Sequence, residues 1–559
     1  MTDDRPVVPG SKWLFMTCFV ALMATSFAFL IRAFTIGDWA ADFGLDPIQQ
    51  GQLNGAGLWP FAITIILFSL VVDRIGYKIV TGFAFLCHLV SVGVTLLAPL
   101  ALADPATADA EAVRAGQAAG YWILYAGMFL AGLAAGTVEA VINPVIATVF
   151  PKEKTRWLNI LHAGWPAGFV CAGLLILGMN EGGPLHGLTE WGSGWEAKVA
   201  ILLIPTAIYG AMVLKAQFPV NERVVAGVSY RDMLSEVGGL GAFVSVSLIF
   251  WEIERVIRSF YDKDAIPFLG SIGEFGLPLA IIPSVLVGLV FLIYTRSLGR
   301  PLFVFLLLVM VLLAVTELGT DGWIKELMGP AMESNFGIDG GWVLVYSALV
   351  MIVLRLFCGP VIRLLNPIGL LLVSCLFAAA GLVFLSTAAG MAILIAATIY
   401  AIGQGFFWPT TLGLVSDRFP RGGALTLNAI AGVGLLGVGI LGQPIIGSIQ
   451  NTHIQSTLKA ELPGETEKVF GPPELSLLGE YRAVDQSKLE ALDNPRLTDR
   501  VAQVQVEAKQ SALAKAAVLP LIMFVCYLGL WLYFRMNGGY KAEELPVTTD
   551  APPKDSRPV

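Results

Sequence analysis

The chain of 559 residues is 56% apolar and only 14% charged, with a formal net charge of −7. Soluble domains carry roughly 25% charged residues because their surfaces face water, so this composition excludes an ordinary soluble enzyme. It indicates instead that lipid surrounds much of the chain. The acidic balance argues against a nucleic-acid partner.

Motifs for cofactors and metals are missing from the sequence. The six cysteines all lie inside apolar stretches without metal-ligand spacing. A phosphate-binding loop of the form G-x-x-x-x-G-K-S/T does not occur, which argues against an ATP-driven pump. We therefore expect neither a cofactor nor a metal site, and no enzymatic activity.

Apolar segments recur along the whole chain. A helix needs about 20 apolar residues to cross a bilayer, and the first such segment is too long for the core of a signal peptide. The fourteen predicted spans are 13–36, 50–72, 79–102, 121–149, 158–179, 199–217, 238–257, 271–294, 301–324, 340–362, 367–388, 391–415, 424–447 and 515–535. The expected fold class is all-α, a polytopic membrane protein.

Basic residues are distributed unevenly between the loops, and cytoplasmic loops carry the excess of Lys and Arg. Segments 37–50 and 180–197 have none, and 103–118 has only Arg114. The loops on the other side hold Arg74, Lys78, Lys152, Lys154, Arg156, Lys215, Arg223, Arg231, Arg296, Arg300, Arg363, Arg418 and Arg421. We expect a bacterial-type inner (plasma) membrane protein with both termini in the cytoplasm.

An internal repeat divides the chain. At an offset of 269 (405 − 136), eight of the identical pairs are Gly136/Gly405, Phe150/Phe419, Pro151/Pro420, Leu158/Leu427, Asn159/Asn428, Gly168/Gly437, Gly173/Gly442 and Gly178/Gly447. Two similar halves are the signature of alternating-access carriers, whose substrate lies near mid-membrane between them. We expect six-helix halves in 1–217 and 301–559, with two extra helices in 218–300.

A polar stretch at 451–512 interrupts the second half. It is rich in Glu, Lys and Gln, and the topology above places it outside the membrane. We expect a solvated cap with an amphipathic helix within 484–512, because long inserts of this kind lie at the surface.

The segment FSLVVDRIGYK (68–78) resembles the major-facilitator loop between spans two and three, G-x-x-x-D-R-x-G-R-K. Asp73, Arg74, Gly76 and Lys78 match that pattern. The resemblance implies the major facilitator fold, with Asp73 and Arg74 bridging the halves when the cytoplasmic side is closed. The alternative is that these charges only anchor the helix ends at the membrane surface.

A second resemblance is narrower and covers about thirty residues. Glu139-Ala-Val-Ile-Asn143-Pro144 and LNILHAGWPAG (158–168) resemble the fucose:proton symporter family. That family has Glu-x-x-x-Asn-Pro in its fourth span and Leu-Asn-x-x-Gln-x-x-Asn-x-x-Gly in its fifth. Here His162 and Trp165 occupy the Gln and second Asn positions, and Arg32 lies in the first span where that family has an aspartate.

Glu139 is the strongest candidate for proton coupling. A charged group in a membrane span costs roughly 2.5–3.5 kcal/mol on insertion scales, so such a residue has either a partner or a task. Asn143 lies four residues on, which places both on one helix face. His162, which titrates near physiological pH, is a candidate relay. The structural alternatives are a silent paired carboxyl and a helix-interface histidine.

The repeat places Trp408 opposite Glu139 (139 + 269). Phe406, Phe407 and Trp408 are therefore expected to form an aromatic wall facing a carboxyl and an amide, which suits the apolar face of a sugar. Packing between helices is the alternative. Candidate substrate-binding residues are Arg32, Asn143, Trp165, Gln404, Trp408 and Asn428.

Further charges lie in the first and seventh spans of the major facilitator fold. We expect Arg32 and Glu317 to form an ion pair across the halves, because they lie at similar depth and pairing offsets desolvation. Glu317 is also a candidate proton site. Asp321 and Arg355, the latter ahead of a glycine-containing turn, are assigned to gating.

The function expected is proton-coupled symport of a small polar solute, in the first place a sugar, by a monomer that alternates access. Arg32 and the aromatic residues leave open an organic-anion carrier or an exporter of amphipathic compounds. A third class, a receptor or assembly factor without transport, has little need for acids at mid-membrane.

Overall fold

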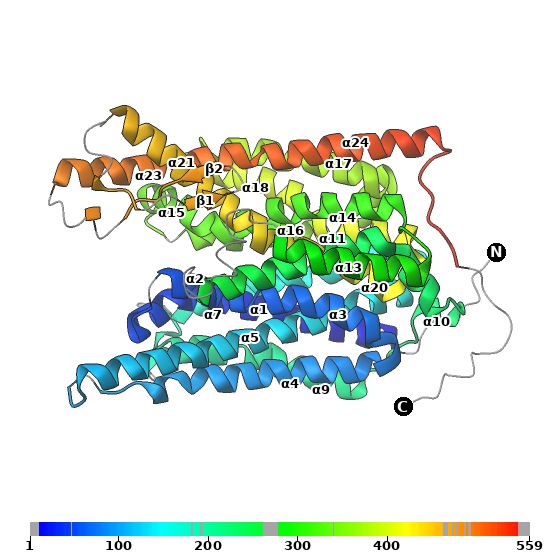
Figure 1. Ribbon diagram of the computed structural model, residues 1–559, viewed down its shortest axis with the longest axis horizontal. Coiled ribbons are helices and arrows are strands. Elements are labelled where there is room, and N and C mark those ends of the chain that lie inside the picture. The colour runs from blue at the N-terminus through cyan, green and yellow to red at the C-terminus, as the bar shows by residue number, and fades with distance from the viewer. Residues whose placement is uncertain are drawn as a thin grey trace.

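The chain folds into a bundle of helices that run side by side along the long axis of the molecule (Figure 1). The structure, a computed structural model, describes residues 10–45, 47–104, 106–179, 183–190, 194–260, 278–338, 340–461, 468–471, 474–476, 479–485, 488–489 and 494–545. Strands within these residues are confined to one small hairpin, so the bundle is helical, as predicted.

The elements follow one another in chain order. In the first part they are α1 (Ser11–Phe43), α2 (Pro47–Ala56), α3 (Trp59–Ile75), α4 (Tyr77–Leu96), α5 (Ala110–Val149), α6 (Lys154–His162), α7 (Gly164–Met179), α8 (Trp195–Ala200), α9 (Leu203–Lys215) and α10 (Glu222–Val225). Then come α11 (Tyr230–Phe260), α13 (Pro278–Thr295), α14 (Pro301–Ala314), α15 (Thr320–Phe336), α16 (Gly341–Leu356), α17 (Gly359–Leu385), α18 (Ala392–Gln404), α19 (Phe407–Arg418), α20 (Gly423–Gly437), α21 (Gln443–Glu461), β1 (Glu474–Ser476), β2 (Gly479–Tyr481), α23 (Pro495–Ala516) and α24 (Val518–Met536).

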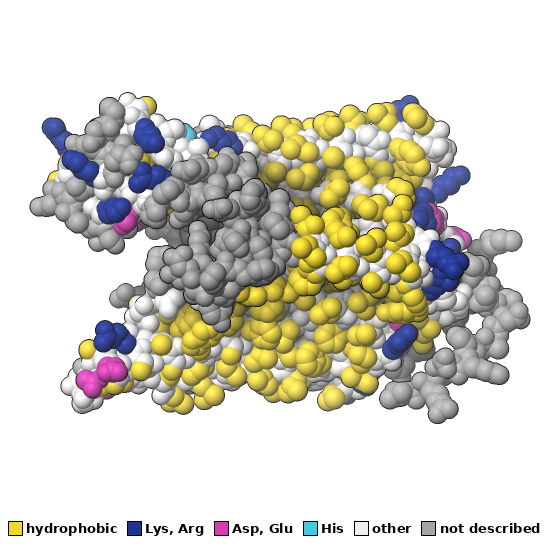
Figure 2. Space-filling model, viewed as in Figure 1, with side chains coloured by type: hydrophobic (Ala, Val, Ile, Leu, Met, Phe, Trp, Pro, Cys, Tyr) yellow, Lys and Arg dark blue, Asp and Glu magenta, His cyan; other side chains and the backbone are white. Residues whose placement is uncertain are grey.

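The outer surface of the bundle matches the hydrocarbon core of a bilayer. Within the described residues, 12 helical stretches are long and apolar enough to span a membrane, and Ile281–Thr295 and Gly341–Leu356 are shorter apolar helices. Apolar side chains cover the middle of the bundle in Figure 2, while Lys, Arg, Asp and Glu gather at its two ends. The chain is therefore a multi-pass membrane protein.

The two repeats pack reciprocally against each other. The amide of Asn159 in α6 donates to Thr410 Oγ1 of α19 over 3.3 Å, and that of Asn428 in α20 donates to the Ala140 carbonyl of α5 over 2.9 Å. Asn159 and Asn428 are equivalent at the offset of 269 residues, and their partners are equivalent to within one residue. The sequence repeat is thus a structural repeat.

Helices α11 and α13 form a hairpin between the repeats. They approach closely where Gly239 and Gly288 face each other, since a Cβ at either would lie 2.9 or 3.1 Å from the other's carbonyl oxygen. Gly238 breaks α11 with φ 59°, a conformation that glycine adopts without steric cost. Part of the predicted span 271–294 lies outside the described residues.

The predicted gap between the spans 340–362 and 367–388 is wrong at one end and confirmed at the other. The helix expected at 340–362 ends at Leu356, and α17 begins at Gly359, inside that predicted span. Asn366 bends α17 with φ 54°, and its side chain accepts from the backbone N–H groups of Ile368 and Gly369. This local capping begins a new helical segment at the predicted start of the span 367–388.

The described part of the polar insert, which includes the β hairpin and most of α23, lies at one end of the bundle (Figure 1). The predicted amphipathic helix is present as α23, which begins at Pro495 rather than near 484. Its buried face includes Val501, Val504 and Ala508, which pack in one cluster with Leu458 of α21. The insert therefore has a small core of its own.

Candidate functional site

Both repeats break their helices near the centre of the bundle. Helix α6 ends at His162 and α7 begins at Gly164, whereas α18 ends at Gln404 and α19 begins at Phe407. Such breaks leave backbone carbonyl groups without intrahelical partners. These carbonyls are available to bind side chains from the facing half.

A small cavity lies at these breaks. It has a volume of about 30 Å³ and is lined by side chains of both repeats: Phe61, Glu139, His162, Trp165, Glu317, Leu318, Arg355, Trp408 and Leu435. Ligand pockets usually measure roughly 300–1,000 Å³, so this space is of the size of one or two water molecules. The two halves are tightly packed around the centre.

Glu139 faces this cavity as one end of a hydrogen-bonded chain. The amide of Asn143 donates to Glu139 Oε2 over 2.6 Å, and His162 Nε2 lies 2.9 Å from Asn143 Oδ1. Because an amide oxygen only accepts, His162 donates through Nε2. The three side chains are buried, and no Lys or Arg among the described residues pairs with Glu139.

Arg355 holds the centre of the bundle together. Its Nη2 donates to Glu317 Oε1 over 3.1 Å, its Nη1 to the His162 carbonyl over 2.7 Å and its Nε to the Gly405 carbonyl over 2.6 Å. The guanidinium therefore binds both helix breaks at once, and it is 1% exposed. Sequence position suggested a place near the turn before Gly359; the side chain instead points into the core.

Glu317 lies in a π-helical turn, Val315–Gly319, between α14 and α15. Such turns widen the helix and often occur at functional sites. One turn further, Asp321 accepts a hydrogen bond of 3.2 Å from the amide of Gln404. Glu317 Oε2 and Gln404 Oε1 are buried without a hydrogen-bond partner among the described residues.

The predicted pair of Arg32 with Glu317 is not formed. Glu317 is bound by Arg355, while the Arg32 guanidinium lies over the Phe29 ring, 5.0 Å from its centroid. Arg32 is 5% exposed.

The predicted aromatic wall is reduced to one residue. Trp408 lines the cavity as expected, but Phe406 and Phe407 are buried in packing between helices and do not line it. Trp165, the other predicted aromatic contact, does line the cavity. Asn428 is bound to the backbone of α5 instead.

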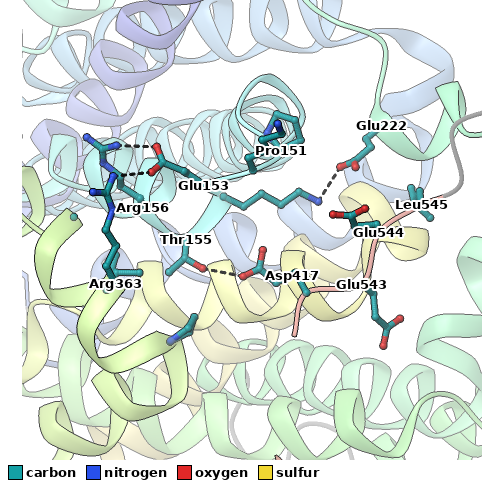
Figure 3. A pocket seen from close by; sticks show the side chains of 16 residues that line it. Pro151, Glu153, Thr155, Arg156, Glu222, Arg363, Asp417, Glu543, Glu544 and Leu545 are labelled. Carbon is teal, nitrogen blue, oxygen red and sulfur yellow. Dashed lines mark hydrogen bonds and ion pairs between the residues drawn. The ribbon is translucent and has the colours of Figure 1, made fainter. Parts of the chain in front are cut away.

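At the basic end, the halves meet around a crevice of about 580 Å³. Figure 3 shows its paired side chains. Glu153 forms ion pairs with Arg156 and Arg363, and Thr155 donates a hydrogen bond to Asp417 Oδ2 over 3.2 Å. The bonds of Arg363 and Thr155 join one repeat to the other. Charge contacts therefore bridge the halves at this end.

Asp73 and Arg74, which were both predicted to act in gating, make two separate contacts. Asp73 forms a buried ion pair of 2.7 Å with Arg223, in the segment that follows the first half. Arg74 lies over the ring of Tyr230, 4.6 Å from its centroid. Arg223 was counted in the sequence only as a topology signal, and its spacing from Asp73 gives no sign of the pairing.

Asp417 is another residue of this end that the sequence analysis did not single out. Besides Thr155, it receives a hydrogen bond of 3.0 Å from the Tyr540 hydroxyl, and its carbonyl accepts from the Glu543 N–H over 2.8 Å. Burial raises the pKa of Tyr540 well above its usual value, so the phenol stays a donor. Glu543 in turn pairs with Arg300 and Arg418, which ties residues 540–543 to this end.

Comparison with known proteins decides the family. The sequence pattern of the Major Facilitator Superfamily matches residues 14–448. The chain belongs to this superfamily of transporters. No curated protein matches the sequence significantly.

Solved structures of the superfamily share the fold. A proton:xylose symporter, XylE, bound to 6-bromo-6-deoxy-D-glucose matches with a TM-score of 0.56 at 12% identity, over 93% of this chain and 95% of that one. The human organic anion transporter MFSD10 matches with 0.53 at 12% identity, over 93% and 100%. An auto inhibited POT family peptide transporter matches with 0.53 at 12% identity, over 98% and 99%. These neighbours differ in what they carry, so the likeness is one of fold.

Proposed function

We propose that this protein is a secondary active transporter that couples a small polar solute to protons and works by alternating access. The moving halves are residues 1–217 and 301–559, and the protein acts as a monomer. The central cavity lies where the helix breaks of both halves meet, which supports it as the place where solute and proton are exchanged. A sugar is the first substrate class to test.

Glu139 is the observation that carries the proposal. It is 3% exposed, lines the cavity and has a neutral amide as its hydrogen-bond partner. A carboxylate buried without a cation is strongly destabilised, whereas a protonated carboxyl in the same place is not. Glu139 is therefore suited to take up a proton before the cavity closes and to release it when water returns.

His162 connects the proton site, Glu139, to the contacts of Arg355 with Glu317 and with the carbonyl groups of His162 and Gly405. These contacts of Arg355 are called the lock between the halves. Its ring binds Asn143, and its backbone carbonyl accepts from Arg355 of the other half. A change at Glu139 that moves Asn143 therefore reaches a bond that joins the halves. This direct contact is a physical route for coupling proton uptake to opening.

The contacts at the basic end support the alternating part of the proposal. With the basic loops in the cytoplasm, the bonds of Thr155 to Asp417 and of Arg363 to Glu153 close the cytoplasmic side. An inward-open state requires these bonds to break. Lys154, whose Nζ lies 2.8 Å from Glu222 and 3.5 Å from the Ser416 carbonyl, belongs to the same closure.

Uptake into proteoliposomes with an imposed pH gradient tests the proposal. A panel of labelled sugars and organic acids is offered with and without a protonophore, and the wild type should accumulate a solute only while the gradient lasts. Glu139→Gln should lose uphill accumulation but keep exchange of solute, because the amide mimics the protonated side chain. The exposed Glu333→Gln is the matched control.

Uphill uptake by Glu139→Gln at the wild-type rate would overturn this role and move the proton site to Glu317 or His162. An organic anion is the second candidate substrate class. It is favoured by one specific observation: the Arg32 guanidinium is buried and has no ion-pair partner among the described residues.

A further inference from the structure

We infer that Arg32 and Trp165 form a subsite that binds the carboxylate group of an organic-acid substrate on the approach to the central cavity. The inference rests on the proposed transport function and names its substrate class. Four observations support it, namely an uncompensated cation, a position prepared for that cation, an orphaned donor and an aromatic path to the cavity.

Arg32 is a buried cation without an anion. It is 5% exposed, and no Asp or Glu among the described residues pairs with it. Arg355, another buried arginine, has both a carboxylate and two carbonyl groups as partners. A guanidinium retained in a membrane span without such partners is a functional candidate by default, and the partner it lacks is an anion.

The backbone is shaped around this guanidinium. Gly57 lies in the turn between α2 and α3, where the Leu58 N–H donates to the Gly55 carbonyl over 2.8 Å. A Cβ built on Gly57 would collide with the Arg32 guanidinium. The turn and the missing side chain together leave room for Arg32, which also lies over the Phe29 ring.

An aromatic path leads from Arg32 to the cavity. The Phe29 ring lies 5.9 Å from the ring of Trp165, which lines the cavity. The indole Nε1 of Trp165 is buried and donates to no acceptor among the described residues. The Arg32 guanidinium and the orphaned indole N–H thus both belong to side chains that border the Phe29 ring, and a carboxylate accepts from donors of either kind.

The distance along α5 between the subsite and Glu139 fits a solute about the size of one ring. Gly57 packs against Gly132 of α5, where a built Cβ would lie 3.0 Å from the Gly57 carbonyl oxygen. Glu139 is seven residues further along α5 (139 − 132), which is about 10 Å along the helix axis. A carboxylate bound by Arg32 and Trp165 thus leaves the remainder of the solute to reach Trp408 and Glu139.

The charges also account for the coupling. The cavity already holds Glu139 and the Glu317–Arg355 pair, so an anion would be repelled unless Glu139 is protonated. One monocarboxylate (−1) moving with one proton (+1) carries no net charge. Transport of a monocarboxylate should therefore respond to a pH gradient and not to membrane potential.

The test uses matched pairs of labelled solutes in proteoliposomes of the full chain: glucose and glucuronate, galactose and galacturonate, benzyl alcohol and benzoate. The carboxylate of at least one pair should accumulate with the pH gradient, and its neutral partner should not. Arg32→Gln should weaken the apparent affinity for that carboxylate by about 100-fold. Arg32→Lys should restore part of it, because charge returns without the planar fork.

Thermal unfolding separates binding from folding. Millimolar carboxylate should raise the unfolding temperature of the wild type but not that of Arg32→Gln, whose own unfolding temperature should not fall. Arg535→Gln is the matched control, since Arg535 is an exposed arginine lying over the Trp531 ring at 5.0 Å. It should behave as the wild type in both assays.

The inference is overturned if the neutral members are the ones accumulated, if no carboxylate is moved by the wild type, or if Arg32→Gln transports it normally. Proton-driven uptake of a neutral solute that depends on Glu139 would leave the proposed function standing while removing this substrate class. An Arg32→Gln protein that unfolds at lower temperature, with unchanged affinity, would assign Arg32 to structure alone.

Discussion

Two glutamates face the same cavity from opposite halves, and their partners differ in charge. Glu139 is 3% exposed and is bound by the Asn143 amide over 2.6 Å, whereas Glu317 is 4% exposed and is bound by the Arg355 guanidinium over 3.1 Å. Burial is therefore nearly equal, and only the compensation differs. A cation stabilises the ionised form of Glu317, while an amide serves either form of Glu139.

The difference indicates which acid changes its protonation during transport. Arg355 is bound to Glu317 and to carbonyl groups of both helix breaks, so removing the Glu317 charge would disturb the contact between the halves. Removing the Glu139 charge alters the hydrogen bond from Asn143 and leaves the charges of the Arg355–Glu317 pair in place. Glu139 is thus the carrier in our proposal, and Glu317 the fixed anion of the lock.

Arg355→Met should have the largest effect. It removes three hydrogen bonds and leaves Glu317 as an uncompensated buried anion, which costs about 3–5 kcal/mol. Thermal unfolding in detergent and uptake in proteoliposomes should show severe loss of both stability and transport. Arg363→Met, at a side chain 74% exposed, should change stability by less than about 0.5 kcal/mol.

The double variant Arg355→Met, Glu317→Gln sharpens this test. It removes both charges, so it should recover part of the lost stability without recovering transport. If the double variant is no more stable than Arg355→Met alone, the two side chains do not compensate each other.

The fold was largely predictable from the sequence, and the site only in part. Apolar length predicted the spans, and the offset of 269 residues identified Asn159 and Asn428 as equivalent residues, because both signals are local or additive along the chain. Depth alone suggested the pair of Arg32 with Glu317. It failed because the rotation of a helix about its axis, which aims Arg355 at Glu317 instead, depends on tertiary packing.

The lining of the cavity illustrates the same limit. Glu139 and Trp408 are equivalent under the repeat and both line the cavity, so symmetry located them correctly. Phe406 and Phe407 precede Trp408 in sequence, yet neighbouring positions on a helix point in different directions, and these two rings pack elsewhere. Asp73 with Arg223 joins residues 150 positions apart, which no local pattern reveals.

Glu317→Gln and Glu139→Gln should differ in sign as well as size. Glu317→Gln leaves Arg355 without its anion and should lower stability by about 2–4 kcal/mol. Glu139→Gln removes an uncompensated acid and should leave stability unchanged or slightly higher. Unfolding curves of the two variants, measured at one pH, give the change in stability of each. If both variants lose stability equally, Glu139 has a cationic partner in the working protein.

Asn143→Leu should have an intermediate effect. It keeps a similar volume but removes the donor to Glu139 Oε2 and the acceptor for His162, at a cost of about 1–3 kcal/mol. Proton-driven uptake should fall while uptake down a solute gradient is retained in part. Unchanged proton coupling in this variant would show that Glu139 works without the Asn143–His162 chain.

The asparagines Asn159 and Asn428 should give the smallest and most even effects. Each is 0% exposed and donates to the opposite half, over 3.3 Å to Thr410 Oγ1 and over 2.9 Å to the Ala140 carbonyl. Alanine at either position removes one such bond, so each variant should lose about 1 kcal/mol of stability. If the two variants lose stability to within a factor of two of each other, the difference between the halves is limited to the charged residues at the centre. If Asn428→Ala were tolerated while Asn159→Ala abolished transport, the inequality between the halves would extend into the scaffold. The contrast between Glu139 and Glu317 would then be one part of a wider division of labour, in which the first half carries the proton and the second holds the lock.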